Sequence, residues 1–251
     1  VDPSNRNVTH AAVIESSDNG LTWSAPKRIT DQITDVAQFK SRFAASGEGI
    51  QLRYGEHTGR LVQQFTFLTL SGAMQAVSVY SDDHGATWQA GTAFGTGMDE
   101  NKVVELSNGD LMVNSRASDG TKARKIAISS DGGETYGPVR VDSSLIDPNN
   151  NAAITRAYPD APEGSAQAKM LLFTNAANTG GRSNGTVKLS YDDGATWSTA
   201  KVFEPGSMSY STITPLDEPG TYGILFEGTS STIRYMRVSL DRHGGLPLSL
   251  T

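Results

Sequence analysis

One eight-residue phrase occurs four times and constrains the fold of this chain more than any other feature. Its shared form is Ser-x-Asp-x-Gly-x-Thr followed by Trp or Tyr, in Ser16–Trp23, Ser81–Trp88, Ser129–Tyr136 and Ser190–Trp197. An Asp carboxylate can accept bonds from backbone N–H groups two residues further on, and Gly tolerates a positive φ. Each copy therefore predicts a hairpin turn between two strands.

The spacing of the copies predicts the architecture. Between successive aromatic positions the intervals are 65, 48 and 61 residues, which fits one four-stranded sheet per unit, as in the blades of a β-propeller. Short β-branched and aromatic runs bounded by turn residues indicate strands, and no amphipathic stretch of 12 residues has helical period. The clearest runs are 61–67, 75–80, 125–128 and 170–173. We therefore expect an all-β fold.

Composition excludes several classes of protein. With 21 Lys and Arg against 27 Asp and Glu, the net charge of −6 argues against a nucleic-acid partner. No run approaches the 18 apolar residues of a membrane span, and the absence of Cys excludes disulfides, thiolate zinc sites and cysteine nucleophiles. The repeats lack the closing Glu of a calcium loop, and the histidines have no metal-ligand spacing. We expect no metal and no cofactor; the histidines are His10, His57, His84 and His243.

The repeated phrase resembles the Asp box, or bacterial neuraminidase repeat, of sialidases. Further stretches are similar to bacterial exo-sialidases of actinobacterial type: Arg42–Gln51, Met98–Lys102, Asn114–Arg116 and Gly206–Ser211. The resemblance covers essentially the whole chain. It implies a six-bladed β-propeller, with residues 1–251 as an N-terminally incomplete catalytic domain of four to five blades. It also implies a secreted or cell-surface enzyme that hydrolyses terminal sialic acids from glycoconjugates with retention.

The chemistry of sialic acid explains the residues that this family uses. Its anomeric carbon carries a carboxylate, which repels an anionic nucleophile, so a neutral Tyr activated by a base is suited to the attack. Arginine forks suit the carboxylate itself. The resemblance assigns Tyr210 as nucleophile, Glu100 as base, and Arg116 and Arg182 as two carboxylate-binding residues. Asp99 is either a partner of these groups or a surface carboxylate.

A second candidate base, Glu105, lies on the same predicted strand. A two-residue turn at Asn108-Gly109 predicts a register that places Arg116 opposite Asn101 and beside Glu100. Glu105 is then about 13 Å nearer the turn, at about 3.4 Å per residue. The family motif also favours Glu100. We therefore expect Glu100 to be the base and Glu105 an outer hairpin residue.

Two parts of the family's catalytic set have no match in the chain. The Phe/Tyr-Arg-Ile-Pro strand that carries the first arginine is absent, and Lys27–Thr30 is not equivalent because it follows the first repeat. The acid/base Asp is expected before that repeat, and Asp2 is too close to the start to be assigned. We therefore expect residues 1–251 alone to be inactive, and a missing propeller segment or additional domains to complete the protein.

Two alternatives remain open from the residues. Asp boxes also occur in non-catalytic propellers that bind glycan or protein, although the Tyr, Glu and Arg set argues against that class. A trans-sialidase would share the same site and differ in the acceptor, whose binding residues the sequence does not locate. Binding of a dehydrated sialic-acid analogue and analysis of the products distinguish these alternatives.

Overall fold

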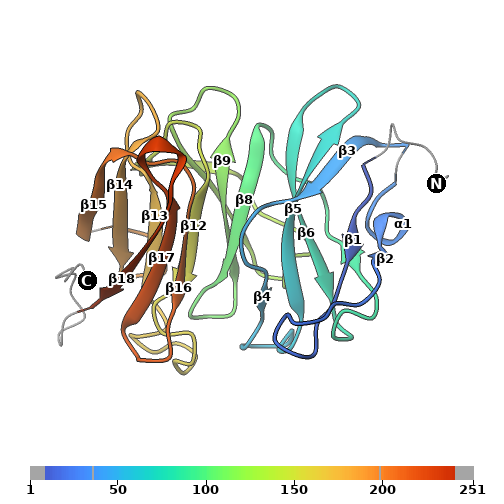
Figure 1. The fold of residues 1–251 in the computed structure, drawn as a ribbon. Coiled ribbons are helices and arrows are strands. Elements are labelled where there is room, and N and C mark those ends of the chain that lie inside the picture. Colours follow the sequence, from blue (N-terminus) through green and yellow to red (C-terminus); the bar gives the residue numbers. More distant parts are fainter. Residues whose placement is uncertain (1–8, 36, 198, 241–251) are drawn as a thin grey trace.

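The computed structural model describes residues 9–35, 37–197 and 199–240, and their regular structure is almost entirely β (Figure 1). Within these ranges the exceptions are a single helical turn, α1 (Thr30–Ile33), and a 3-10 turn, η1 (Thr229–Ser231). The prediction of an all-β fold is confirmed. In the same part of the chain, no helix has the length and apolar character needed to cross a membrane.

The strands pair antiparallel, mostly with their neighbours along the chain, and form five sheets in the described residues. In chain order the sheets contain β1 (Ala12–Val13) and β2 (Lys27–Arg28); β3 (Phe39–Ala44), β4 (Ile50–Gln51), β5 (Leu61–Thr69), β6 (Met74–Ser81) and β7 (Gln89–Ala90); β8 (Met98–Glu105), β9 (Leu111–Ala117), β10 (Ala123–Ser129) and β11 (Arg140–Ile146); β12 (Ala152–Arg156), β13 (Leu171–Ala176), β14 (Ser183–Ser190) and β15 (Thr199–Ser207); and β16 (Ser211–Pro215), β17 (Thr221–Glu227) and β18 (Ile233–Ser239).

The strands β4, β8, β12 and β16 of the last four sheets lie toward a common centre. β8 contacts both β5 and β12, and β12 contacts β16 (Figure 1). Residues of β4, β8, β12 and β16 line one cavity of about 1020 Å³. Sheets that each place an inner strand around one central space are the blades of a β-propeller. The described residues therefore form four blades, and the pair of β1 and β2 belongs to a further repeat.

All four Asp boxes connect the last two strands of their sheets and share one set of hydrogen bonds. In the second box, Ser81 Oγ donates to Asp83 Oδ1 and accepts from the N–H of Gly85, both at 2.8 Å. The N–H of Thr87 donates to Asp83 Oδ1 at 2.8 Å and its hydroxyl to Oδ2 at 2.6 Å. The carboxylate thus reaches four residues along the turn, not the two expected. Gly85 has φ 88°, which explains the invariant Gly of the phrase.

The aromatic residue that closes each box packs between sheets in three of the four copies. Trp88 packs against the core beside β6, Tyr136 stacks on Phe94 at 4.2 Å, and Trp197 lies 5.7 Å from Phe173. Trp23 of the first box is 58% exposed. The boxes are therefore structural elements of the blades.

The hydrogen bonds within a box predict a pH dependence of stability. Bonds from the hydroxyl and N–H of Thr87 and from the Ser81 hydroxyl lower the pKa of Asp83 to about 2. A carboxyl group with a lowered pKa stabilises the fold above its unfolded pKa of about 4, and this contribution is lost as the pH falls toward 2. We expect Asp83→Asn to remove this part of the pH dependence in urea unfolding between pH 4 and 2. An Asp83 carboxyl signal that titrates near 4 in carbon NMR would contradict the account.

The turn between β8 and β9 differs from the prediction by one residue. Leu106 pairs with Asp110, so the loop contains three residues, and its last residue, Gly109, has φ 87°. In the resulting register Asn101 faces Ser115, not Arg116. A three-residue hairpin loop that ends on a left-handed Gly is a standard alternative to the two-residue turn. Even so, Arg116 remains at the Glu100 end of the hairpin.

Candidate active site

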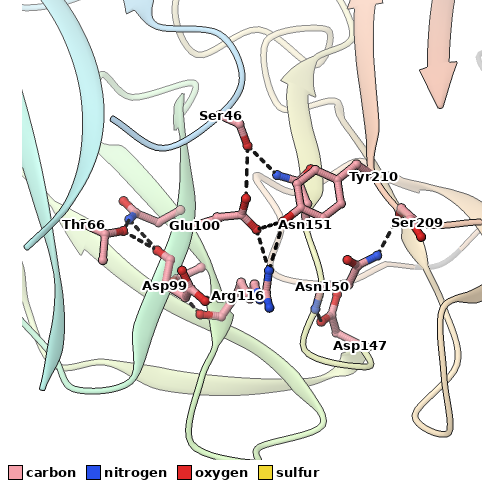
Figure 2. Close-up of polar contacts among 12 residues, drawn as sticks. Ser46, Thr66, Asp99, Glu100, Arg116, Asp147, Asn150, Asn151, Ser209 and Tyr210 are labelled. Atoms are coloured by element: carbon pink, nitrogen blue, oxygen red, sulfur yellow. Dashed lines mark hydrogen bonds and ion pairs between the residues drawn. The ribbon is translucent and has the colours of Figure 1, made fainter. Parts of the chain in front are cut away.

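The side chains of Tyr210, Glu100 and Arg116 meet (Figure 2), and Tyr210 also lines the central cavity. Tyr210 Oη donates a hydrogen bond of 2.9 Å to Glu100 Oε2. Arg116 Nη1 donates to the same carboxylate oxygen at 2.8 Å and to Tyr210 Oη at 3.2 Å. Residues 110 positions apart in sequence thus form one triangle of a phenol, a carboxylate and a guanidinium group.

The strand directions explain why these side chains meet. Glu100 lies near the start of β8, and Tyr210 directly precedes β16, so both occupy the beginning of a first strand. Arg116 lies near the end of β9, which runs antiparallel to β8 and returns to the same end. The Asp boxes that follow β6, β10 and β14 lie at the opposite end of their blades. The fold therefore separates the candidate site from the repeats that stabilise the blades.

Burial and hydrogen bonding determine the charge states of the triangle. Burial raises the pKa of Tyr210, and the hydrogen bond to Glu100 and the charge of Glu100 raise it further. Burial alone would lower the pKa of Arg116, but Glu100 and Asp99 outweigh it and raise that pKa. Tyr210 is therefore a neutral phenol that donates to Glu100, beside a permanently charged guanidinium group.

Asp99 lies behind Arg116 and is not a surface carboxylate. Its Oδ2 is 3.3 Å from Arg116 Nε, although the angle is too poor for a hydrogen bond, and its side chain is 14% exposed. Burial is the main cause that raises the pKa of Asp99. The Asp99 carbonyl accepts bonds from Thr66 Oγ1 and Asn101 Nδ2, both at 2.8 Å. These contacts fix the backbone next to Glu100.

Arg182 also lies beside Tyr210. Its guanidinium carbon lies 5.6 Å from the centre of the Tyr210 ring, within the range of a cation–π contact. Its carbonyl accepts from the N–H of Met208 at 3.1 Å, which ties the turn before β14 to the segment that carries Tyr210. The Arg182 side chain is exposed, and among the described residues no carboxylate lies within ion-pair distance of it. Its charge is available to an anion.

The prediction that Glu105 is an outer hairpin residue is wrong. Glu105 is 3% exposed and accepts from the N–H groups of Arg53 and Tyr54 at 3.0 and 2.9 Å. It also pairs with Arg156 at 3.4 Å. These partners come from neighbouring blades, so the carboxylate is buried at the far end of the cavity. Glu105 therefore connects blades and has no contact with Tyr210.

A buried polar network below the triangle was not predicted. Arg124, with no exposed surface, pairs with Asp147 at 3.4 Å and donates to the Asn150 carbonyl at 2.7 Å. The Asn150 side chain donates to the carbonyl of Ser209 at 2.8 Å (Figure 2). Since Ser209 precedes Tyr210, this network fixes the backbone that carries the Tyr210 side chain. Consecutive Asn residues before a strand are the one sequence signal for it, and that signal is also typical of turns.

No group of three or more His, Cys, Asp or Glu residues in the described ranges has the geometry of a metal site. His243 and Asp2 lie outside the described residues. The polar atoms of the triangle bind one another.

Comparison with known proteins shows the family of the chain. A family model described as a BNR repeat-like domain matches residues 1–224. The chain belongs to the BNR repeat-like domain family. This BNR repeat-like chain is 60% identical to a sialidase of Micromonospora viridifaciens, over 98% of the chain and 37% of that protein. It is 30% identical to a sialidase of Bacteroides fragilis, over 90% of the chain and 41% of that protein.

Solved structures agree with the fold of this BNR repeat-like domain. A Hadza microbial sialidase superposes with a TM-score of 0.81 at 31% identity, over 92% of the chain and 44% of that structure. The intramolecular trans-sialidase of Ruminococcus gnavus superposes with a TM-score of 0.79 at 24% identity, over 95% of the chain and 52% of that structure, and it shows the fold alone. The chain spans less than half the length of the curated relatives named above.

Proposed function

We propose that this chain is the larger part of the catalytic propeller of a retaining exo-α-sialidase. Its substrates would be terminal sialic acids of glycoconjugates, and the protein would be secreted or attached to the cell surface. The observation that carries the proposal is the 2.9 Å hydrogen bond from Tyr210 Oη to Glu100 Oε2. Arg116 Nη1 donates to both of these oxygens, Tyr210 Oη and Glu100 Oε2. The 60% identity to a sialidase over 98% of the chain supports it.

In the proposed mechanism, the guanidinium groups of Arg116 and Arg182 bind the sialic-acid carboxylate on two sides of Tyr210. Glu100 removes the phenolic proton as Tyr210 Oη attacks the anomeric carbon. The bond to the aglycone breaks, and the leaving oxygen takes a proton from an acid supplied elsewhere in the complete protein. Water then attacks the anomeric carbon from the face that the aglycone left and gives one proton to the group that had protonated the leaving oxygen. The bond between the sugar and Tyr210 breaks, and Glu100 returns its proton to the phenolate oxygen. Two displacements give net retention.

A neutral nucleophile is what this site offers. Because the pKa of Tyr210 is raised, its phenol is protonated before the reaction. The proton therefore leaves during the attack and goes to the Glu100 carboxylate, which already accepts a hydrogen bond from it. Asp99 forms an ion pair with the Arg116 guanidinium group at 3.3 Å, which helps to hold that group beside Glu100. We assign Asp99 this positioning role.

We expect Arg116→Lys to raise KM more than it lowers kcat. A lysine keeps the charge but loses the planar pair of donors, which costs about 2 kcal/mol or about 30-fold in kcat/KM. The measurement is steady-state hydrolysis of a fluorogenic sialoside by the complete natural protein. Arg140→Lys is the matched control, since Arg140 is half-exposed and pairs with Asp142 away from the triangle. Unchanged KM in Arg116→Lys would remove Arg116 from carboxylate binding.

We expect residues 1–251 expressed alone to show little or no sialoside turnover. The chain has no match for the family's first arginine, and loss of a positioned general acid typically costs about 10²- to 10⁴-fold in rate. The comparison is with the complete natural protein, and circular dichroism checks that both are folded. Equal turnover would mean that a residue of this chain acts as the acid.

Product analysis tests the reaction itself. Proton NMR of 3′-sialyllactose digestion by the complete protein should show α-sialic acid first, which then converts slowly to the β anomer. Initial β anomer would contradict the Tyr mechanism. Transfer to a sugar or an intramolecular product would assign a trans-sialidase, and binding of a dehydrated sialic-acid analogue without turnover would assign a non-catalytic glycan-binding propeller.

A further inference from the structure

We infer that Ser46 is a positioning residue that orients the Glu100 carboxylate, with Asn151 as its support; this rests on the proposed role of Glu100 as the base. Ser46 Oγ lies 3.4 Å from Glu100 Oε1, the carboxylate oxygen that faces away from Tyr210. Asn151 Nδ2 donates to Ser46 Oγ at 2.9 Å (Figure 2). The three residues come from three blades.

The donors and acceptors in these two hydrogen bonds follow from the chemistry of the side chains. An amide nitrogen can only donate, so Ser46 Oγ accepts from Asn151 and its own hydrogen is left for another acceptor. The acceptor within reach is Glu100 Oε1. At 3.4 Å this bond is longer than usual for two oxygens, so its contribution is small. Its other oxygen, Oε2, already accepts from Tyr210 and Arg116.

The backbone around Ser46 is held on both sides. Ala45 donates its N–H to the Gln64 carbonyl at 2.9 Å, and its own carbonyl accepts from Gln63 Nε2 at 3.1 Å. On the other side, Gly47 has φ 119°, and a Cβ there would lie 2.6 Å from Lys102 Nζ. Lys102 is buried and two residues beyond Glu100 on β8. The loop between β3 and β4 therefore rests on the strand that carries the base.

This arrangement defines a task for each carboxylate oxygen. Rotation of the Glu100 carboxylate about its last bond would move Oε2 away from Tyr210. Contacts on both oxygens oppose that rotation, so Oε2, which receives the phenolic proton, stays 2.9 Å from Tyr210 Oη. Orientation of a base within hydrogen-bond reach is a requirement for proton transfer. The effect of Ser46 should therefore appear in kcat and not in KM.

The test is the Ser46→Ala variant of the complete natural protein. We expect kcat to fall about 3- to 10-fold with little change in KM, because an oriented hydrogen bond to a charged group is lost. The acidic limb of the profile of kcat/KM against pH should move to higher pH, since a bond that favours the carboxylate form is removed. Ser46→Thr, which keeps the hydroxyl, should restore both quantities. Ser130→Ala, an exposed position of the third Asp box, is the matched control.

Two further results separate this inference from the proposed function. Asn151→Ala should act in the same direction, and the double variant should cost less than the sum of the single effects. In a crystal structure of Ser46→Ala, the Glu100 carboxylate should occupy more than one orientation. A single unchanged orientation, or wild-type kcat and pH profile in Ser46→Ala, would overturn the inference. Disorder of Glu100 in a protein that never cleaves sialosides would uphold it and overturn the proposed function.

Discussion

Replacing Tyr210 by Phe is expected to lower kcat/KM for sialoside hydrolysis by at least about 10³-fold. The substitution removes one oxygen atom, and with it the group that would attack the anomeric carbon and donate to Glu100 at 2.9 Å. The ring stays in place, so its contact with Arg182 and the binding of the substrate carboxylate should survive. The loss should therefore lie mainly in kcat.

The measurement is steady-state turnover of a fluorogenic sialoside by the complete natural protein and its variants. Tyr235→Phe serves as control, because Tyr235 is 62% exposed on β18 and distant in sequence from the triangle. Binding of a dehydrated sialic-acid analogue to Tyr210→Phe should stay within a few-fold of wild type. Turnover like that of wild type in Tyr210→Phe would remove Tyr210 from the mechanism.

Replacing Arg124 by Met is expected to destabilise the fold by about 3–5 kcal/mol. Arg124 and Asp147 are 0% and 1% exposed in their side chains, and the variant would leave a buried carboxylate without its counter-charge. Burial lowers the pKa of Arg124, because removing the guanidinium charge from water is unfavourable. The charge of Asp147 offsets part of this effect. Arg124 also donates to the carbonyl of Asn150, which holds the backbone before Tyr210. Stability and the site therefore depend on the same network.

Urea unfolding of the complete natural protein measures this effect. Arg237→Met is the matched control, since the Arg237–Glu218 pair is exposed and such pairs contribute less than about 1 kcal/mol. Adding Asp147→Asn to Arg124→Met should recover part of the loss, because the unpaired charge is removed. A loss in Arg124→Met no greater than in Arg237→Met would show that the buried pair has no special role.

The sequence predicts the hairpin turns because all their contacts are local. Ser, Asp, Gly and Thr of one Asp box bind one another within eight residues, so the phrase carries its own structure. The register of the β8–β9 hairpin was missed by one residue for an equally local reason. An Asn-Gly pair fits both a two-residue and a three-residue loop, and the left-handed Gly109 closes the longer one.

The contacts between blades could not be predicted from the sequence. Glu105 looks like a hairpin residue until the N–H groups of Arg53 and Tyr54 are placed against it from another blade. Ser46 and Asn151 are 105 positions apart, and no motif links them. The pairing of Tyr210 with Glu100 follows from the resemblance to sialidases, and the structure brings the two side chains together. Strand pairing follows local pattern, whereas the packing of one blade on the next depends on the whole fold.

The most direct test of the account is to trap and locate the covalent intermediate. A sialosyl donor with a good leaving group and a fluorine beside the anomeric carbon slows both displacements, so the glycosyl-enzyme should accumulate. After digestion of the complete natural protein, mass spectrometry should find the added sialosyl mass on the peptide that contains Tyr210, and on its phenolic oxygen. An adduct on Glu100 or on any other residue, or turnover without an adduct on Tyr210, would contradict the account.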